Sequence, residues 1–428
     1  MNPARKAAYF SLLKTETNGA FSNLETLSAE QSEALSPENR GLYRQLYFGV
    51  IEKKIPLDYL LSRMSDHPLN RLDAEVLCIL ELGALQILYL DRIPDHAALH
   101  ESGELAKRFC RHCLPMVNAI LRRLIREKDT VFSLLNFPGK KGLSLKYGYP
   151  KHLIGLWQES YGTQKCLEIM EAQNQRAAMT LRINTLKTDA NGYAALLDQA
   201  RIPYHFNSLC RNAITLEHPQ APFELPGFAD GLFFIQDAAA ARAVDRLGAK
   251  PGERILDLCA APGGKSFGAA MDMEGRGTVV SLELHPSRLN LIREGAKRLG
   301  IEILTASQND SSVPNSDFSE AFDRVICDVP CSGYGTIAKK PDIRHKSKED
   351  SENLPEIQKK ILEAGALAVK SGGFLLYSTC TLNPAENEKI TDDFLERHPE
   401  FSRVGEKETI FPKGGENDGF FCDLLEKL

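Results

Sequence analysis

Hydrophobic positions recur at helical spacing through about the first 135 residues of the chain. In Ala7–Leu13 and Leu42–Ile51, apolar residues return every three or four positions, which is the period of an amphipathic helix. The stretch Ala74–Leu90 is apolar almost throughout, as is typical of the central helix of a bundle. Asp95 follows a proline and is expected to cap the next helix. The pattern predicts an all-α domain over residues 1–138.

The spacing becomes mixed in the middle of the chain. Residues 137–142 are rich in Pro, Gly and Lys, which indicates a linker. Met179–Asn184 and Ala213–Leu216 have the short apolar runs of strands, and Asn191–Ala200 has the spacing of a helix. We therefore expect a small α+β domain over residues 139–235.

From residue 236 to the end, short apolar runs alternate with helical patterns. The expected strands are Arg254–Leu258, Thr278–Leu284, Glu302–Ala306, Arg324–Cys327 and Gly373–Leu376. The expected helices are Ser287–Leu299, Glu352–Lys370 and Ala385–Arg397. This alternation predicts an α/β domain with a mostly parallel sheet over residues 236–428. Two further runs, Lys407–Phe411 and Gly419–Leu424, are expected to form an antiparallel edge.

Composition narrows the class of protein. The chain has 428 residues, 43% hydrophobic and 25% charged, as expected of a globular protein with more than one domain. It contains neither a membrane-length apolar run nor a signal peptide, so we expect a cytoplasmic protein. The 10 cysteines are scattered, which favours reduced thiols over a disulfide framework. A zinc site at Cys110–Cys113 is disfavoured because no second ligand pair has compatible spacing, so we expect no metal.

The net charge of −5 means that any binding to nucleic acid must use local patches. Residues 101–128 hold seven Lys or Arg against three Glu, and residues 331–348 hold five Lys or Arg against one Asp. Each patch has a net charge of +4. A solvated helix face would explain either patch alone, but the second begins at a motif that carries candidate chemistry. We expect Lys339–Lys348 to lie near nucleic-acid phosphates.

The sequence indicates a cofactor site at the start of the α/β domain. The glycine-rich loop Cys259–Lys265 follows the first expected strand, Glu283 lies at the end of the second, and Asp310 and Asp328 follow the third and fourth. In open α/β sheets this edge binds ligands: glycines admit the cofactor closely, and a carboxylate on the second strand suits a ribose diol. A P-loop is the rival interpretation of this loop. It is disfavoured because position 259, where the P-loop needs its first glycine, is Cys.

Two cysteines follow the fourth and fifth expected strands. Cys331 lies three residues after Asp328, and Cys380 ends the run Tyr377–Cys380. A single cysteine at a strand end is usually buried filler. If these two strands are neighbours, however, their ends lie roughly 5 Å apart and both thiols flank one substrate group. Two thiols beside a cofactor loop suggest covalent catalysis.

Four motifs of the chain resemble those of a known family. Asp257–Lys265, Asp328–Gly333, Ser378–Cys380 and Asn383–Glu388 resemble the ordered motifs of the RNA (cytosine-5) methyltransferases of the NOL/NOP/Sun group. The helical segment resembles a NusB-type RNA-binding domain. The combination is similar to a bacterial branch of the family, and the resemblance covers nearly the whole chain. It implies a Rossmann-like catalytic domain.

The resemblance also implies the cofactor and the site. S-adenosylmethionine would be the cofactor, held by Cys259, Ala260, Ala261, Pro262, Gly263, Gly264, Lys265, Glu283, Asp310 and Asp328. Cys380 would be the nucleophile and Cys331 would assist product release. Asp328 would hydrogen-bond the N3/N4 edge of the cytosine and stabilise charge in the adduct. Val329, where the family often has Ala, and the lack of a Ser after Asp237 are small departures.

By the same resemblance, the substrate is a cytosine of 16S ribosomal RNA. We expect a monomer that has no membrane association. An RNA-binding ribosome-assembly factor with a vestigial methyltransferase domain is the alternative, because the helical domain could bind RNA or protein by itself. Retention of both thiols, Asp328 and the full glycine loop disfavours it.

Overall fold

The computed structural model describes residues 1–18 and 35–428 and divides into two compact units. One unit comprises Met1–Glu159 together with Lys340–Lys346, and the other comprises Ser160–Lys339 together with Ser347–Leu428. The part of the expected helical domain at residues 19–34 lies outside the described residues. The three-domain boundaries at 138 and 235 stay a prediction.

The first unit is helical, as its hydrophobic spacing predicts. Its helices are α1 (Pro3–Asn18), α3 (Pro37–Met64), α4 (Ala74–Tyr89), α5 (Asp95–Phe109), α6 (Leu114–Arg126), α7 (Lys128–Val131) and α8 (Gly139–Tyr147). The apolar helix α4 packs against α1, α3, α5 and α6, and it is buried from Cys78 to Leu88. This central position explains why α4 has no polar face.

Two local predictions in this unit are wrong. Asp95 does not cap α5: it is the first helical residue, Pro94 holds the cap position, and the Asp95 carboxylate pairs with Lys128 at 2.8 Å. The supposed linker at residues 137–142 runs into a helix, because α8 begins at Gly139. Gly and Lys are compatible with the exposed start of a short helix, so composition alone was misleading there.

A short segment that follows the Cys331 motif in the sequence belongs to the helical unit. The 3₁₀ turn Pro341–His345 lies against α3, where the buried guanidinium of Arg344 donates to the Glu52 carbonyl oxygen at 3.1 Å. The same guanidinium lies 4.5 Å from the ring centroid of Tyr149. Arg344 is therefore not available to a phosphate, contrary to the expectation for the basic run Lys339–Lys348.

The second unit contains two sheets. The smaller is antiparallel in the order β2-β3-β1-β4, formed by β1 (Met179–Ile183), β2 (Tyr204–Phe206), β3 (Ala213–Leu216) and β4 (Phe233–Ile235). Strands β2 and β4, three residues each, were not predicted. Helix α9 (Lys151–Gln173), broken at Gly162, precedes this sheet, and α10 (Ala190–Gln199) lies between β1 and β2. The Asp189 side chain caps α10 by accepting from the Gly192 amide at 2.7 Å.

The larger sheet carries the predicted alternation of strands and helices. Its strands are β5 (Arg254–Asp257), β6 (Thr278–Glu283), β7 (Leu304–Gln308), β8 (Phe322–Asp328), β9 (Val369–Thr379), β10 (Phe401–Arg403), β11 (Glu408–Ile410) and β12 (Phe420–Lys427). The order is β10-β12-β9-β8-β5-β6-β7, with β5 to β9 parallel. The expected neighbourhood of the fourth and fifth strands is confirmed, because β8 pairs with β9.

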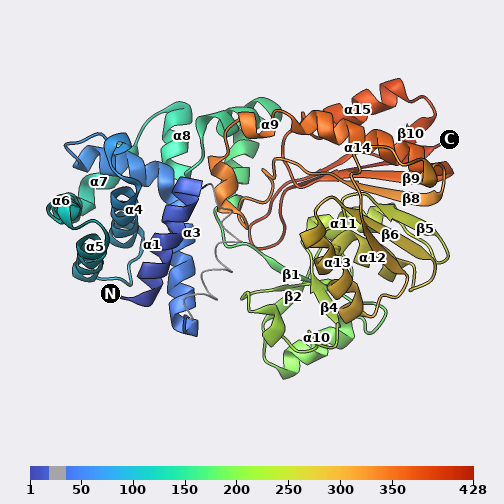
Figure 1. Cartoon of the computed structure of the whole chain (residues 1–428), viewed down its shortest axis with the longest axis horizontal. Helices are drawn as coiled ribbons and strands as arrows, with labels where there is room; N and C mark the ends of the chain where they lie inside the picture. The colour runs from blue at the N-terminus through green and yellow to red at the C-terminus, as the bar shows by residue number, and fades with distance from the viewer. Residues whose placement is uncertain (19–34) are drawn as a thin grey trace. The chain divides into compact units, whose positions relative to one another are not determined.

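Helices cover both faces of this sheet (Figure 1). They are α11 (Ala238–Leu247), α12 (Gly264–Asp272) and α13 (Pro286–Leu299) on one face, and α14 (Leu354–Ala368) and α15 (Glu388–Arg397) on the other. The expected antiparallel edge is only partly right. Strand β12 is antiparallel but lies inside the sheet between β9 and β10, and it is buried from Phe420 to Leu425. The antiparallel edge beyond β12 is formed by two three-residue strands: β11, which lies within the expected run Lys407–Phe411, and β10, which was not predicted.

Candidate functional site

The glycine-rich loop connects the carboxyl end of β5 to the amino end of α12. Gly263 occupies the cap position of α12 with φ +112°, a conformation that L side chains rarely adopt. A Cβ atom there would lie 2.3 Å from the Phe267 ring, so the backbone needs glycine at this point. The first amides of α12 have no partner inside the helix and carry its partial positive charge. The loop thus has the geometry of a cradle for a negative group.

Asp257, at the end of β5, stabilises this loop through a hydrogen bond to α12. Its fully buried carboxylate accepts from the Ser266 hydroxyl at 2.6 Å, and Ser266 in turn accepts from the Ser281 hydroxyl at 2.8 Å. Burial raises the pKa of Asp257 to about 6. Its Oδ1 atom receives no hydrogen bond from any residue that the structure describes. The buried carboxyl therefore holds α12 against the sheet and keeps one polar atom at the base of the loop.

The predicted acidic residues lie at the ends of successive strands. Glu283 ends β6 and is buried, and its Oε1 atom accepts from the His285 amide at 3.0 Å. Among the described residues, none donates a hydrogen bond to its Oε2 atom, so this oxygen suits a ribose hydroxyl. Asp310 follows β7 and is exposed, and two hydrogen bonds from Ser312 lower its pKa. The glycine cradle and these carboxylates fit S-adenosylmethionine.

Lys265 and Asp328 form an ion pair beside the loop. The Lys265 Nζ atom lies 2.6 Å from Asp328 Oδ2 and 5.0 Å from the ring centroid of Phe420. Burial alone would lower the pKa of Lys265, but the Asp328 carboxylate more than offsets this, so the net shift is upward. Asp328 Oδ1 accepts from the Ser378 hydroxyl at 2.8 Å. Lys265 therefore points at the end of β8.

The two predicted catalytic thiols meet at the ends of β8 and β9. Asp328 is in register with Ser378 across these strands, and the Sγ atoms of Cys331 and Cys380 lie 3.4 Å apart. Both side chains are partly exposed, so a substrate can reach them. The hydrogen bond with Cys380, followed by burial, raises the pKa of Cys331 well above its usual value.

The sequence predicted the thiols and carboxylates of this site but not the polar residues that hold them. A buried network behind the thiols contains Ser332, Gln358, Thr381 and Glu386. Ser332 and Glu386 had a signal in the sequence, because they lie in the motifs Asp328–Gly333 and Asn383–Glu388. Gln358 lies on α14, and no local pattern links it to a strand end 28 residues away.

The two basic patches behave differently. On the helical unit, Lys107, Arg108, Arg111, Arg122 and Arg126 are exposed, and the opposite face of α6 packs into the core. This first patch is available to an anionic partner. In the second patch, the Lys339 Nζ atom pairs with Asp237 at 2.5 Å and with Asp418 at 2.9 Å. Lys339 thus serves the fold at the start of α11.

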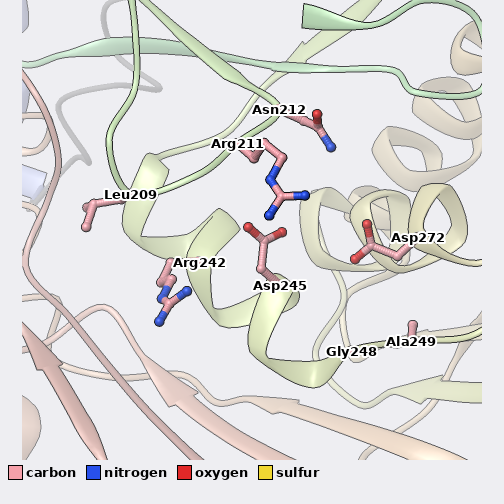
Figure 2. Close-up of a pocket in the computed structure, with 8 residues that line it drawn as sticks. All are labelled: Leu209, Arg211, Asn212, Arg242, Asp245, Gly248, Ala249 and Asp272. Carbon is pink, nitrogen blue, oxygen red and sulfur yellow. The ribbon is translucent and has the colours of Figure 1, made fainter.

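A polar pocket of about 480 Å³ lies away from this site (Figure 2). It is lined by Leu209, Arg211, Asn212, Arg242, Asp245, Gly248, Ala249 and Asp272. Gly248, which lines the pocket, caps the carboxyl end of α11. Asp237, which contacts Lys339, caps the amino end, so the pocket lies toward the opposite end of that helix. None of the predicted site residues lines this pocket.

The fold and site define a Rossmann-like methyltransferase domain joined to a NusB-type helical domain, and comparison with known proteins agrees. Residues 244–426 match the model of the 16S rRNA methyltransferase RsmB/F family. Residues 2–126 match the NusB family, and residues 149–222 match a RsmF/B-like ferredoxin-like domain.

Curated relatives are similar over the full length. The probable ribosomal RNA small subunit methyltransferase B of Bacillus subtilis is 36% identical, with 99% of this chain and 98% of the relative covered. The ribosomal RNA small subunit methyltransferase B of Shigella boydii is 33% identical, with 95% and 94% covered. The crystal structure of PH0851 shares the fold at a TM-score of 0.82 and 24% identity, covering 100% of this chain and 99% of that one.

The chain therefore belongs to the RsmB/F family of rRNA methyltransferases, which confirms the family predicted from the motifs. It is an S-adenosylmethionine-dependent rRNA methyltransferase, and the predicted cofactor and fold class are confirmed with it. In the part of the chain that the structure describes, no helix is both long and apolar enough to cross a membrane.

Proposed function

We propose that this enzyme methylates C5 of a cytosine in 16S rRNA and that Cys380 forms a covalent bond to C6 of that cytosine. The observation that carries the proposal is the pair of thiols, 3.4 Å apart, at the strand ends that also hold Asp328. Plain alkylation of an exposed amine would need neither thiol. The names of the relatives, which specify the ribosomal small subunit, support 16S rRNA as the substrate.

Cytosine C5 is a poor nucleophile, and the chain's residues must change that. Addition of the Cys380 thiolate to C6 breaks the aromaticity of the ring and makes C5 enamine-like. When bound, S-adenosylmethionine supplies the methyl group that C5 accepts. Transfer of the C5 proton to solvent and breakage of the Sγ–C6 bond, whose electron pair returns to sulfur, then restore the ring and free the Cys380 thiolate. A thiol suits this sequence because it both attacks and leaves well.

Chemistry alone permits either thiol to attack C6, so the division of roles rests on the family resemblance. By that resemblance we assign the attack to Cys380 and assistance in product release to Cys331. The hydrogen bond with Cys380 raises the pKa of Cys331, which suits a thiol that does not attack. The Asp328 carboxyl would bind the N3/N4 edge of the base, and its ion pair with Lys265 fixes its orientation at the strand end.

The cofactor would occupy the cradle at the ends of β5 to β8. The loop from Cys259 to Gly264 would receive its amino-acid part, with the amino end of α12 favouring the carboxylate. Glu283 would bind the ribose hydroxyls, and Asp310 would lie near the adenine. Lys265 and Asp328 would adjoin the methyl donor.

The target cytosine must be unpaired or flipped out to reach Cys380. The exposed basic patch on α5 and α6 would bind phosphates of the same RNA, with an affinity that falls as salt rises. A monomeric state and a cytoplasmic location stay predictions.

The test is methyl transfer from labelled S-adenosylmethionine to 16S rRNA from a strain that lacks the gene. We expect 5-methylcytidine in the digested RNA and no other labelled nucleoside. Label in a different nucleoside would contradict the assignment of C5. Intact RNA binding with no incorporation would instead favour the assembly-factor alternative.

A further inference from the structure

Cys331 and Cys380 lie beyond the ends of strands β8 and β9. Strand β8 ends at Asp328 and β9 ends at Thr379, so Cys331 and Cys380 both lie in the loops that follow. Cys380 directly follows β9, but Cys331 lies three residues beyond β8, so the ladder alone does not set the 3.4 Å separation of the two sulfur atoms. The contacts between the loops must do so.

Glu386 makes two of these contacts, and Thr381 and the Cys380 carbonyl oxygen make the others that link the two loops. Glu386 is fully buried, and each of its carboxylate oxygens accepts two hydrogen bonds. Oε1 accepts from the Ser332 hydroxyl at 2.5 Å and from Asn383 Nδ2 at 2.8 Å. Oε2 accepts from the Ser332 amide at 2.8 Å and from Gln358 Nε2 at 2.9 Å.

These donors come from three elements. Ser332 is the neighbour of Cys331, Asn383 belongs to the loop of Cys380, and Gln358 lies on α14. Gln358 Nε2 also donates to the Pro330 carbonyl oxygen at 3.0 Å, so both neighbours of Cys331 are held. Cys380 has a separate anchor, because its carbonyl oxygen accepts from the Gly335 amide at 3.0 Å.

We propose that Glu386 is the positioning residue that holds the loop of Cys331 against the loop of Cys380, so that Cys331 can assist product release. The proposal rests on the proposed function of the two thiols and adds the group that aligns them. Glu386 touches neither sulfur by these contacts and acts through Ser332. Its loss should therefore impair release more than attack.

Glutamine is an informative replacement because it is nearly isosteric. Both oxygens of Glu386 face an N–H donor, so either orientation of a glutamine amide directs its NH₂ group at another donor. Glu386→Gln thus breaks the hydrogen bonds between the two loops with little change in side-chain volume. Ser332→Ala removes the hydroxyl that contacts both Glu386 and Thr381, and it leaves the hydrogen bond from the Ser332 amide to Glu386 intact. It keeps the Glu386 charge and serves as a second variant should the first fold poorly.

The alignment is measured first without RNA or cofactor. Diamide takes two electrons and two protons from a thiol pair, so the rate of the Cys331–Cys380 disulfide reports how often the sulfurs meet. We expect Glu386→Gln to slow this rate roughly tenfold, as the loss of one charge-assisted hydrogen bond implies, and Ser332→Ala to slow it less. The matched control is Glu396→Gln, the same change at an exposed position of α15. Equal rates in Glu386→Gln, Ser332→Ala and the control overturn the proposal.

The second measurement uses RNA and cofactor. We expect Glu386→Gln to form the enzyme–RNA adduct and to retain it, as a slow band on a denaturing gel, roughly tenfold longer than the control. Rapid release with normal turnover overturns the positioning role. Because the disulfide rate needs no substrate, a failure of methyl transfer in the wild type would count against the proposed function and leave this test readable.

Discussion

At the scale of single residues, buried charge organises the site. Asp257 is fully buried below the cofactor loop, and Lys265 and Asp328 face each other at its rim. Each buried carboxylate or ammonium has lost water and is retained because hydrogen bonds or an opposite charge replace it. Asp257 is only partly compensated, because its hydrogen bond from Ser266 reaches one oxygen. It is therefore the residue whose protonation should be visible in the stability of the fold.

Asp257→Asn should remove a pH dependence of stability. The pKa of Asp257 is about 6 in the folded chain, above the value of an exposed aspartate, so the folded state holds the proton more tightly. The stability that this group contributes is present below pH ~4 and is lost as pH rises through 6, by about 3 kcal/mol. Urea unfolding of both proteins at pH 5 and 8 measures it. The wild type should lose more stability than the variant over that interval, and parallel changes would contradict the account.

At the scale of elements, the site depends on a close approach of three segments. Gly335 follows the Cys331 loop, donates to the Cys380 carbonyl oxygen, and accepts from the Gly419 amide just before β12 at 2.8 Å. A Cβ atom on Gly335 would lie 2.1 Å from the Gly419 carbonyl oxygen. Strand β12 can therefore pack beside β9 next to the thiols only if position 335 has no side chain.

Gly335→Ala should separate β12 from the Cys380 loop. We expect a loss of about 1–3 kcal/mol in the free energy of unfolding, as for overpacked cores, together with a fall in methyl transfer. The matched control is Gly41→Ala on α3, where a Cβ atom would meet nothing within 4 Å. Urea unfolding and initial rates measure both variants. A Gly335→Ala protein as stable and active as the control would contradict this account, because it would show that the three segments accommodate a Cβ atom at position 335.

The sequence predicted elements well where packing follows a simple period. The apolar helix α4 and the parallel strands β5, β6, β8 and β9 were predicted because each contains a run of mostly buried apolar residues. The short strands β2, β4 and β10 were missed because three residues carry no detectable period. The place of β12 inside the sheet was missed because pairing between distant segments leaves no local mark.

For the site, the motifs predicted the reactive residues but not the contacts that hold them in place. Both thiols, Asp328 and the glycine loop were expected, and the structure brings the thiols together. Lys265 was expected to contact the cofactor, but its ion pair with Asp328 was not foreseen, since charge pairing depends on the tertiary fold. The roles of these residues stay predictions until they are measured.

At the scale of the whole molecule, two separate stretches of the chain belong to the helical unit. The segment Lys340–Lys346 follows the Cys331 motif in sequence but is part of the helical unit. Its anchor is Arg344, whose side chain is 1% exposed, hydrogen-bonds the Glu52 carbonyl and covers Tyr149. An arginine buried in this way contributes through its packing as well as through its hydrogen bond.

Arg344→Ala should release this segment from α3. The lost contacts are expected to cost about 1–3 kcal/mol locally, which would raise cleavage by a lysine-specific protease between Lys339 and Lys348 by roughly tenfold or more. Lys346→Ala is not a suitable control because it removes a cleavage site, so Glu396→Gln, at an exposed position outside the segment, serves instead. Unchanged cleavage in Arg344→Ala would show that the segment is held by other contacts.

The most direct test of the central claim is to locate the protein–RNA bond. Cys331→Ala is incubated with 16S rRNA and S-adenosylmethionine, the RNA is digested, and peptide mass spectrometry finds the modified cysteine. The account predicts an accumulated adduct with a methylated cytidine on Cys380, and none in Cys380→Ala. An adduct on any other residue, or methyl transfer that persists in Cys380→Ala, would contradict it.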